Sequence, residues 1–464
     1  MEREKLGSRL GFILLSAGCA IGIGNVWKFP WMVGQNGGAA FVLIYLFFLI
    51  VMGVPVLTME FALGRAAQAS PAKMYQKLEK KGTKWHWHGI AALLGNIILM
   101  MFYTVVAGWM LQYFVKTVAG DFEGTATDPL IGTKDSMVAK IFADMNGDAT
   151  TLLIYTAIIV VIGFAICAIG LQNGIEKITK VMMMLLIVLI VVLAVNSIFL
   201  KGGGEGLKFY LMPSLENMKK AGIANVIVGA MNQSFFTLSL GIGSMAIFGS
   251  YIGRDRALMG EAVTVSILDT FVAFTSGLII FPACSSFGVE PGAGPSLIFQ
   301  TLPPVFDSLP WGRIWGALFF IFMTFAAFST VIAVFENIIA CIRDLTDWSR
   351  KKACLICGIT MFILAMPCAL GFNAWSNIKP FGAGTNIMDL EDFLVSNILL
   401  PLGSVVVLLF CVNKRYGWGW DNFVAEANEG KGIKVKKWMR GYMTFVLPLM
   451  ILSVFVIGLI NFFA

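Results

Sequence analysis

The amino-acid sequence predicts an all-α, polytopic membrane protein, and its composition and hydropathy support this fold class. Of the 464 residues, 58% are hydrophobic and only 13% are charged, whereas soluble proteins carry about 25% charged residues. The mean hydropathy is +0.81. So few charges could not cover the surface of soluble domains of this length. The composition therefore excludes a soluble enzyme, a nucleic-acid-binding protein and a disordered scaffold.

Eleven apolar stretches are long enough to cross a bilayer, because a helix of about 20 residues spans the hydrocarbon core. Their length and continuity predict helices rather than the shorter alternating strands of a membrane barrel. In chain order, the predicted spans are residues 10–33, 39–63, 88–117, 152–170, 174–200, 225–252, 258–284, 313–342, 353–372, 393–412 and 440–463.

The positive charges predict the orientation of these spans, because cytoplasmic loops carry an excess of Lys and Arg. With the amino terminus in the cytoplasm, the cytoplasmic segments hold 24 of the 34 basic residues and the outer segments hold 9. An odd number of spans then places the carboxyl terminus outside. We therefore expect a multi-pass protein of the cytoplasmic (inner) membrane. The net charge of +7 reflects this topology, so its expected partner is the lipid bilayer and not nucleic acid.

The sequence contains no pattern that indicates covalent chemistry. All eight cysteines lie in the predicted spans or near their ends, so we expect buried free thiols. Cys354 and Cys357 have the spacing of a redox or metal pair, but no second pair and no nearby histidine completes it. There is no nucleophile–base pair, phosphate-binding loop or metal cluster. We therefore predict that the chain is not an enzyme and has no catalytic residues.

Two spans contain glycines that an uninterrupted helix would avoid. Gly18, Gly22 and Gly24 lie in the first span, and Gly241 and Gly243 lie in the sixth. Each glycine costs about 1 kcal/mol of helix propensity relative to alanine, so these clusters predict local unwinding. Unwinding exposes peptide groups that hydrocarbon cannot satisfy, whereas a bound cation and a bound zwitterion could. For either span alone, the alternative is close helix packing against small residues.

The two breaks occupy corresponding places in the chain. Spans 1–5 (residues 10–200) and spans 6–10 (residues 225–412) form two groups of five, and residues 440–463 remain as an eleventh span. Because five is odd, the second group starts from the opposite side of the membrane. A broken first helix in each half predicts an inverted-repeat transporter with its binding site near the bilayer midplane.

Four motifs resemble the neurotransmitter:sodium symporter family. They are AIGIGNVWKFP (residues 20–30, followed by Asn36-Gly-Gly), EFALGR (60–65), QSFFTLSLGIG (233–243) and AAFST (326–330). The similarity extends from Arg3 to about Arg415, and eleven spans instead of twelve resembles a bacterial branch that transports hydrophobic amino acids. The resemblance implies a LeuT-type fold with a 5+5 inverted repeat and 11 transmembrane helices.

The resemblance also implies two sodium sites built from hard oxygen ligands, which suit a hard cation. The first would use Ala20, Asn25, Thr237 and Asp269, together with the carboxylate of the substrate. The second would use the carbonyls of Gly18, Ile21 and Ala326 and the hydroxyls of Ser329 and Thr330. For these two hydroxyls, the alternative is a hydrogen bond to a carbonyl one turn earlier in their own helix.

The substrate implied by the resemblance is an amino acid. Its carboxylate would meet the amides around Gly22 and Gly24 and the Tyr103 hydroxyl, because the amino-terminal end of a half-helix favours an anion. Its ammonium group would meet carbonyls near Ala20, Phe236 and Ser239. Its side chain would lie among Leu99, Tyr103, Phe236, Ile242 and Val334. These residues are apolar or aromatic, so a hydrophobic or aromatic side chain fits better than a charged one.

Two carboxylates lie within the predicted spans, where an ionisable group is a functional hypothesis by default. Chloride-dependent relatives carry asparagine at the position of Asp269, so Asp269 would supply a fixed negative charge and make transport chloride-independent. Ala273 stands one turn later, where some chloride-independent relatives carry glutamate. We expect Glu60 to accept hydrogen bonds from the freed amides of the broken first span.

The resemblance implies one gate on each side of the site. Lys28 and Asp392, with Gln233, would close the outer path. Arg3 and Asp344, with Tyr251, would close the inner path.

Two residues near the inner side depart from the family pattern. Leu6 replaces a tryptophan that is usual near the amino terminus, and Met184 replaces a proline that promotes unwinding of the fifth span. These departures leave open how the inner path opens.

We therefore predict a sodium-coupled secondary symporter that imports hydrophobic or aromatic L-amino acids by alternating access, independently of chloride, with Na⁺ bound at two sites. Spans 1, 2, 6 and 7 would move against the rest. One alternative is a proton-coupled transporter in which Asp269 or Glu60 titrates. A second alternative is a non-transporting amino-acid sensor, although the sequence contains no signalling domain.

Overall fold

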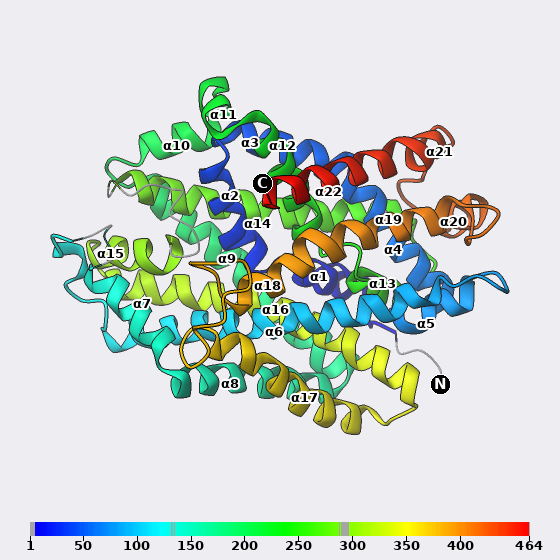
Figure 1. Cartoon of the computed structure of the whole chain (residues 1–464), viewed down its shortest axis with the longest axis horizontal. Helices are drawn as coiled ribbons and strands as arrows, with labels where there is room; N and C mark the ends of the chain where they lie inside the picture. Colours follow the sequence, from blue (N-terminus) through cyan, green and yellow to red (C-terminus); the bar gives the residue numbers. More distant parts are fainter. Residues whose placement is uncertain (1–4, 131–132, 134, 287, 289–296, 464) are drawn as a thin grey trace.

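The structure, a computed structural model, describes residues 5–130, 133, 135–286, 288 and 297–463. The described residues are helical, and their only β-type pairing is an isolated bridge between Arg256 and Lys431. Figure 1 shows the helices as a single bundle in which chain-distant segments lie side by side. The predicted all-α membrane fold is thus confirmed.

Nine helical segments of the described chain are long and apolar enough to cross a membrane. They are α3–η2–α4 (Ala39–Ala67), α6 (His86–Ala119), α8 (Ala149–Ile169), η4–α9 (Leu171–Ile198), α14 (Leu258–Ser286), α16 (Gly312–Thr346), α17 (Arg350–Leu370), α18–η6–α19 (Ile387–Val412) and α21–η7–α22 (Met439–Ile460). A tenth span is a bent pair, α1 (Arg9–Ala20) and Gly24–Gln35, which comprises η1 and α2, at an angle of 53°.

The prediction of eleven spans is not reproduced as eleven long helices in the described chain. Residues 225–252 form two short helices instead, α12 (Ile223–Thr237) and α13 (Ser244–Gly249). The turns of residues 238–243 separate them, so neither helix has the length of a span. The physical reason is the glycine-rich segment that the sequence analysis identified as a break.

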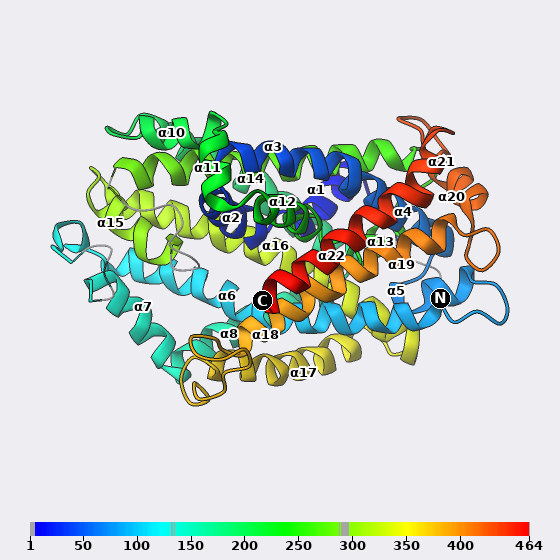
Figure 2. The same ribbon diagram turned by 45° about the horizontal axis from the view of Figure 1, so that its top comes forward.

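The two broken segments lie in the middle of the bundle. Figures 1 and 2 place α1 and α13 beside α16 at the centre, with α8 and α17 along one edge. Burial follows this arrangement, because 83% of the apolar core of α16 is buried but only 39% of that of α8 or α17. The edge helices therefore face lipid, and the broken helices are enclosed by protein.

All eight cysteines are free and buried, as predicted. The link between α4 and α6 contains a short helix, α5 (Pro71–Leu78), with Ser70 at its N-cap position and Pro71 at its first position.

A buried ion pair joins the carboxyl-terminal end of α4 (Val54–Ala67) to α20 (Trp420–Ala427). Arg65 is fully buried, and its Nε lies 2.6 Å from Glu426 Oε1. Its Nη1 also donates to the carbonyls of Arg256 at 2.7 Å and Gly253 at 3.3 Å. The guanidinium is thus satisfied by one carboxylate and the loop that follows α13. Removing one partner from such a pair leaves an uncompensated buried charge.

The variant Glu426→Gln should therefore destabilise the protein by about 3 kcal/mol, measured as a lower melting temperature of the purified protein in detergent. Asp421→Asn is the matched control on the same helix, because Asp421 is 63% exposed in its pair with Lys414. An exposed pair contributes about 0–1 kcal/mol. Equal melting temperatures for the two variants would contradict the assigned role of Arg65.

Candidate functional site

The first break lies between α1 and η1 (Gly24–Lys28). Helix α1 ends at Ala20, and Ile21 has an extended backbone with φ −73° and ψ 94°. The freed amide of Ile23 donates to Tyr103 Oη on α6 at 2.9 Å. The carbonyl of Gly24 accepts from Gln233 Nε2 at 3.1 Å. Side chains from other helices thus replace part of the lost helical ladder, as a buried break in a membrane requires.

Steric crowding explains the glycines at this break. A Cβ on Gly22 would lie 2.1 Å from Tyr103 Oη and 2.4 Å from Thr330 Oγ1. A Cβ on Gly24 would lie 2.8 Å from the ring of Phe236. Only glycine fits these positions, so the residues that weaken the helix also allow its neighbours to approach the backbone.

The second break, residues 238–243, requires a left-handed backbone at three positions. The φ angles of Ser239, Gly241 and Gly243 are 50°, 92° and 69°. A Cβ on Gly241 would also lie 2.2 Å from the carbonyl oxygen of Leu400. The carbonyl of Ile242 accepts from Asn96 Nδ2 on α6 at 2.7 Å. Asn96 was not among the predicted site residues, and its only signal in the sequence is an amide side chain inside an apolar span.

Glu60 serves the second break and not the first, so the prediction that it accepts from the first span is wrong. Its Oε1 accepts from Gly241 N at 2.6 Å and its Oε2 accepts from Met245 N at 3.2 Å. The carboxylate therefore caps the amino-terminal end of α13. Helix α4 packs closely against α13, and this packing, which local sequence does not encode, directs Glu60 to the second break.

A buried cluster joins Asn25, Thr237 and Asp269, three of the residues predicted for the first sodium site. Asn25 Nδ2 donates to Asp269 Oδ1 at 2.7 Å. Thr237 Oγ1 lies 2.9 Å from Asp269 Oδ2 and 3.2 Å from Asn25 Oδ1. Each of the three side chains is at most 1% exposed. The cluster brings a carboxylate, an amide oxygen and a hydroxyl together beside both breaks.

The oxygens predicted for the second sodium site converge between α1 and α16. Ser329 Oγ lies 3.0 Å from the carbonyl oxygen of Gly18, 3.3 Å from that of Ile21 and 2.9 Å from that of Ala326. Thr330 Oγ1 lies 3.1 Å from Gly18 O and 3.5 Å from Ile21 O.

This second cluster has more acceptors than protons. Thr330 Oγ1 is also 3.3 Å from the carbonyl oxygen of Cys19, which the sequence analysis did not include. Each hydroxyl has one proton to donate, so two protons face four carbonyl oxygens. A set of surplus oxygen acceptors suits a hard monovalent cation.

A central cavity lies between the two breaks and has about 350 Å³ of empty volume, including space open to its surroundings. Its lining contains no charged side chain and has one phenolic hydroxyl, that of Tyr103. Eight of the residues predicted to bind substrate line it: Ala20, Gly22, Gly24, Leu99, Tyr103, Phe236, Ser239 and Ile242.

Val334 is the exception among the predicted substrate residues. It is fully buried on α16 but is not part of the cavity lining. The lining also includes Cys19, Thr330, Val395 and Leu400, none of which was predicted to bind substrate. Val395 lies in the π-helical turn η6 (Leu394–Leu399), and Pro401 after it was the one sequence signal of an irregular helix there.

The ion pair predicted for the outer gate is present beside the cavity. Lys28 Nζ lies 3.2 Å from Asp392 Oδ1, 3.1 Å from Ser396 Oγ and 3.8 Å from the centre of the Phe236 ring. Lys28 and Asp392 line a second cavity, which has about 630 Å³ of empty volume including its open mouth and which Tyr103 and Phe236 also line. These two aromatic rings therefore separate the central cavity from the second one.

A second charged network includes Tyr251, which was predicted for the inner gate. Tyr251 Oη donates to Glu336 Oε1 at 2.7 Å, and the other carboxylate oxygen of Glu336 pairs with Arg350. Arg350 Nε also donates to the carbonyl of Cys167 at 2.7 Å. The sequence analysis identified Tyr251 but neither Glu336 nor Arg350.

Of the other two residues predicted for the inner gate, the structure describes Asp344 but not Arg3. Asp344 Oδ2 accepts from the amide of Ser70 at 2.7 Å. Arg3 lies outside the described residues. Leu6, at the position where relatives carry tryptophan, donates from its amide to Tyr251 O at 3.4 Å and packs against the core.

The fifth span is irregular at its start and not at Met184. Residues Leu171–Glu176 form the π-helical segment η4, and α9 (Lys177–Ile198) continues as a regular helix through Met184. Glu176 accepts from Gly7 N at 2.7 Å and from Ser8 Oγ at 2.9 Å. The irregular turn is therefore attached to the segment that leads into α1.

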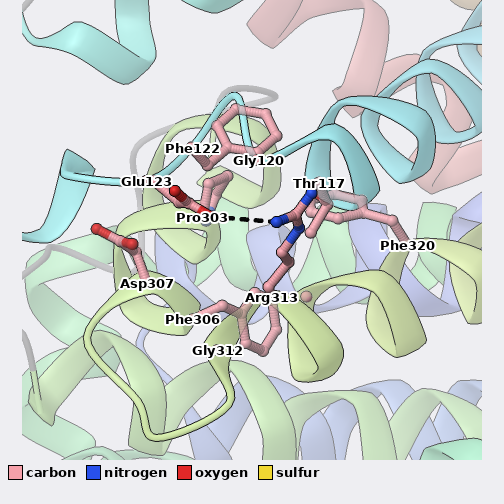
Figure 3. Close-up of a pocket in the computed structure, with 11 residues that line it drawn as sticks. Thr117, Gly120, Phe122, Glu123, Pro303, Phe306, Asp307, Gly312, Arg313 and Phe320 are labelled. Carbon is pink, nitrogen blue, oxygen red and sulfur yellow. Dashed lines mark hydrogen bonds and ion pairs between the residues drawn. The ribbon is translucent and has the colours of Figure 1, made fainter.

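A further pocket, between the end of α6 and the start of α16, is separate from the central cavity. Figure 3 shows Arg313 reaching across it to Glu123, with Nη1 at 3.3 Å from Glu123 Oε1. Its Nε donates to the carbonyl of Val118 at 2.9 Å. The guanidinium thus joins the end of α6 to the start of α16, beside α15 (Leu302–Asp307). The pocket is the space around this structural contact.

Comparisons with known proteins give a consistent result. The family model described as "Sodium:neurotransmitter symporter family" matches residues 3–138 and 136–464. The uncharacterized sodium-dependent transporter YhdH of Bacillus subtilis is 33% identical, with 98% of each chain covered. The sodium-dependent serotonin transporter of Drosophila melanogaster is 24% identical, with 99% of this chain and 77% of its own length covered. A solved structure, MhsT in complex with L-phenylalanine, is 36% identical, covers 98% of this chain and 99% of its own, and has a TM-score of 0.86.

Glu60→Ala should destabilise the protein, because it leaves the amides of Gly241 and Met245 without a partner in a fully buried place. An unsatisfied buried group costs about 1–3 kcal/mol, so the melting temperature should fall. Glu60→Gln keeps one oxygen acceptor and should give an intermediate value. Glu216→Ala, at a position that is 77% exposed, is the control. A Glu60→Ala protein as stable as the control would refute the capping role.

Proposed function

Because the chain belongs to the sodium:neurotransmitter symporter family, we propose that it is a sodium-coupled symporter that imports hydrophobic or aromatic L-amino acids. The single observation that carries this proposal is the arrangement of two buried oxygen clusters beside one apolar cavity. The family consists of transporters and not enzymes, as the sequence analysis predicted.

The substrate proposed for the cavity is a zwitterion with an apolar side chain. The amides at Gly22 and Gly24 and the Tyr103 hydroxyl would bind its carboxylate, and carbonyls near Ala20, Phe236 and Ser239 would bind its ammonium group. Leu99, Phe236 and Ile242 would surround the side chain. The absence of charged residues from the lining disfavours lysine or glutamate. The phenylalanine bound in the similar structure supports an aromatic substrate.

Coupling between ion and substrate would arise at the first cluster. Sodium would replace the mutual hydrogen bonds of Asn25, Thr237 and Asp269, and the substrate carboxylate would complete its coordination together with the carbonyl of Ala20. The substrate would then be a ligand of the ion, so each would raise the affinity for the other, as linkage requires. Sodium at the second cluster would hold α1 against α16.

Transport by alternating access would require the two charged closures to open in turn. Separation of Lys28 from Asp392 would open the outer side of the cavity. Separation of Glu336 from Tyr251 and Arg350 would open the inner side. If only one side is open at a time, the sodium gradient can drive net movement of the substrate. The distribution of basic residues supports an amino terminus in the cytoplasm and a carboxyl terminus outside, in the cytoplasmic membrane.

Two alternative functions can be distinguished from this proposal. Coupling to protons is favoured by the full burial of Asp269 and Glu60 and predicts uptake in the absence of sodium. A sensor would bind the amino acid and would not accumulate it.

Proteoliposomes containing the protein should accumulate labelled phenylalanine when sodium is higher outside, and replacement of sodium by choline should abolish uptake. Unlabelled leucine, tyrosine and tryptophan should compete, whereas lysine and glutamate should not. Ser329→Ala removes an oxygen of the second cluster and should raise the half-saturating sodium concentration about tenfold, which corresponds to about 1.4 kcal/mol.

Thr324→Val is the matched control on α16, because the Thr324 hydroxyl bonds only to Phe320 O of its own helix. Its sodium dependence should be that of the native protein. Uptake that persists in choline would favour proton coupling, and ligand binding without accumulation would favour a sensor.

Asp269→Asn removes the proposed fixed negative charge of the first cluster. Uptake should be lost or should become responsive to external chloride, because an anion can then supply the missing charge. The measurement is uptake in chloride against gluconate, with the outer-loop variant Asp121→Asn as control. The proposed source of chloride independence would be rejected if the Asp269→Asn protein took up substrate as fast as the native protein and equally well with and without chloride.

A further inference from the structure

A groove between α8 and α17 lies away from the central cavity and has no role in the proposed transport cycle. The two helices pack side by side along one edge of the bundle (Figures 1 and 2). The groove has about 1080 Å³ of empty volume including its open mouth, and its walls are almost entirely apolar. The one charged residue in its lining is Lys351.

The walls of this groove face the lipid. Val161 and Leu355 are each 66% exposed, and Ile359 is 57% exposed. An empty groove between such side chains would forfeit the dispersion contacts that a close-packed neighbour supplies. In a bilayer, the neighbour available at this depth is an acyl chain.

The length of the groove corresponds to one leaflet. Its lining on α17 runs from Lys351 to Ile363, which is about 18 Å at 1.5 Å per residue. One half of the hydrocarbon core is about 15 Å thick. Lys351 is the second residue of α17, so the basic end of the groove lies at the level of the lipid headgroups.

The three basic residues at the start of α17 have different surroundings. Arg350 is bound to Glu336 and to the carbonyl of Cys167. Lys352 Nζ lies 4.7 Å from the centre of the Trp348 ring. Lys351 has no hydrogen-bond or ion-pair partner among the described residues. Its ammonium group is therefore the one available for a ligand in the groove.

Gly358 determines the depth of the groove at its middle. A Cβ at this position would lie 3.4 Å from the ring of Phe164, which stacks on Phe335 with ring centres 4.0 Å apart. The stacked rings form a firm floor, so a larger side chain at residue 358 would occupy the space above them.

We propose that the groove binds one anionic phospholipid, with an acyl chain along α8 and α17 and the phosphate on Lys351. Basic residues at the ends of membrane helices recognise anionic headgroups in this way. The acyl chain supplies apolar contact, and Lys351 supplies the preference for negative charge. This site is independent of the proposed transport function.

Native mass spectrometry of the purified full-length protein tests this site. The protein is titrated with phosphatidylglycerol or phosphatidylcholine of identical acyl chains. One phosphatidylglycerol should be retained under conditions that remove phosphatidylcholine. Lys351→Gln should lower the phosphatidylglycerol affinity about fivefold, which corresponds to about 1 kcal/mol for one basic residue. Gly358→Leu should weaken binding of both lipids at this site.

Two controls match these variants. Lys81→Gln removes an exposed lysine from the loop between α5 and α6, and Gly441→Leu adds a side chain where no atom lies within 4 Å. Both should retain native binding. Equal retention of the two lipids, native phosphatidylglycerol affinity in Lys351→Gln, or a dimer that excludes lipid from this face would overturn the proposal. Lys351 is exposed, so its variant remains informative if Gly358→Leu does not fold.

Discussion

The satisfaction of peptide groups at two helix breaks is the constraint on which the rest of this structure depends. A regular membrane helix satisfies its own backbone, but a break in hydrocarbon leaves amides and carbonyls that need other partners. Tyr103 and Gln233 serve the first break, and Glu60 and Asn96 serve the second. These partners come from three helices, α4, α6 and α12, so the breaks can persist only where these helices meet. This requirement places both breaks at the centre of the bundle.

The same constraint explains why the ion clusters and the cavity lie together. Breaking a helix creates free carbonyls, and at Gly18 and Ile21 these carbonyls face the hydroxyls of Ser329 and Thr330. The break also removes side-chain bulk, because glycine is the only residue that fits beside Tyr103 and Phe236. Oxygen ligands and empty space are thus two consequences of one local feature. The proposed site for a hard cation and an apolar zwitterion would make use of both.

The Lys28–Asp392 pair and the network around Glu336 differ in how far water reaches them, and this difference affects the cost of separating them. Lys28 and Asp392 are 18% and 38% exposed, so water screens their attraction and the pair can separate at modest cost. Glu336 is 1% exposed, and its carboxylate is held by Tyr251 and Arg350. A buried charge that loses one partner is penalised strongly. Separating Glu336 from Tyr251 and Arg350 therefore requires that water or another group replaces these contacts.

The sequence by itself determined the membrane fold, the positions of both breaks and most residues around the cavity. These features depend on local patterns, such as apolar length, glycine clusters and hydroxyl pairs, and on motifs shared with a known family. Only the tertiary structure decided that Glu60 caps the second break, that Val334 is excluded from the cavity and that Glu336 pairs with Arg350. The reason is that these outcomes depend on the rotation and depth of one helix against another, which packing sets and which no single segment encodes.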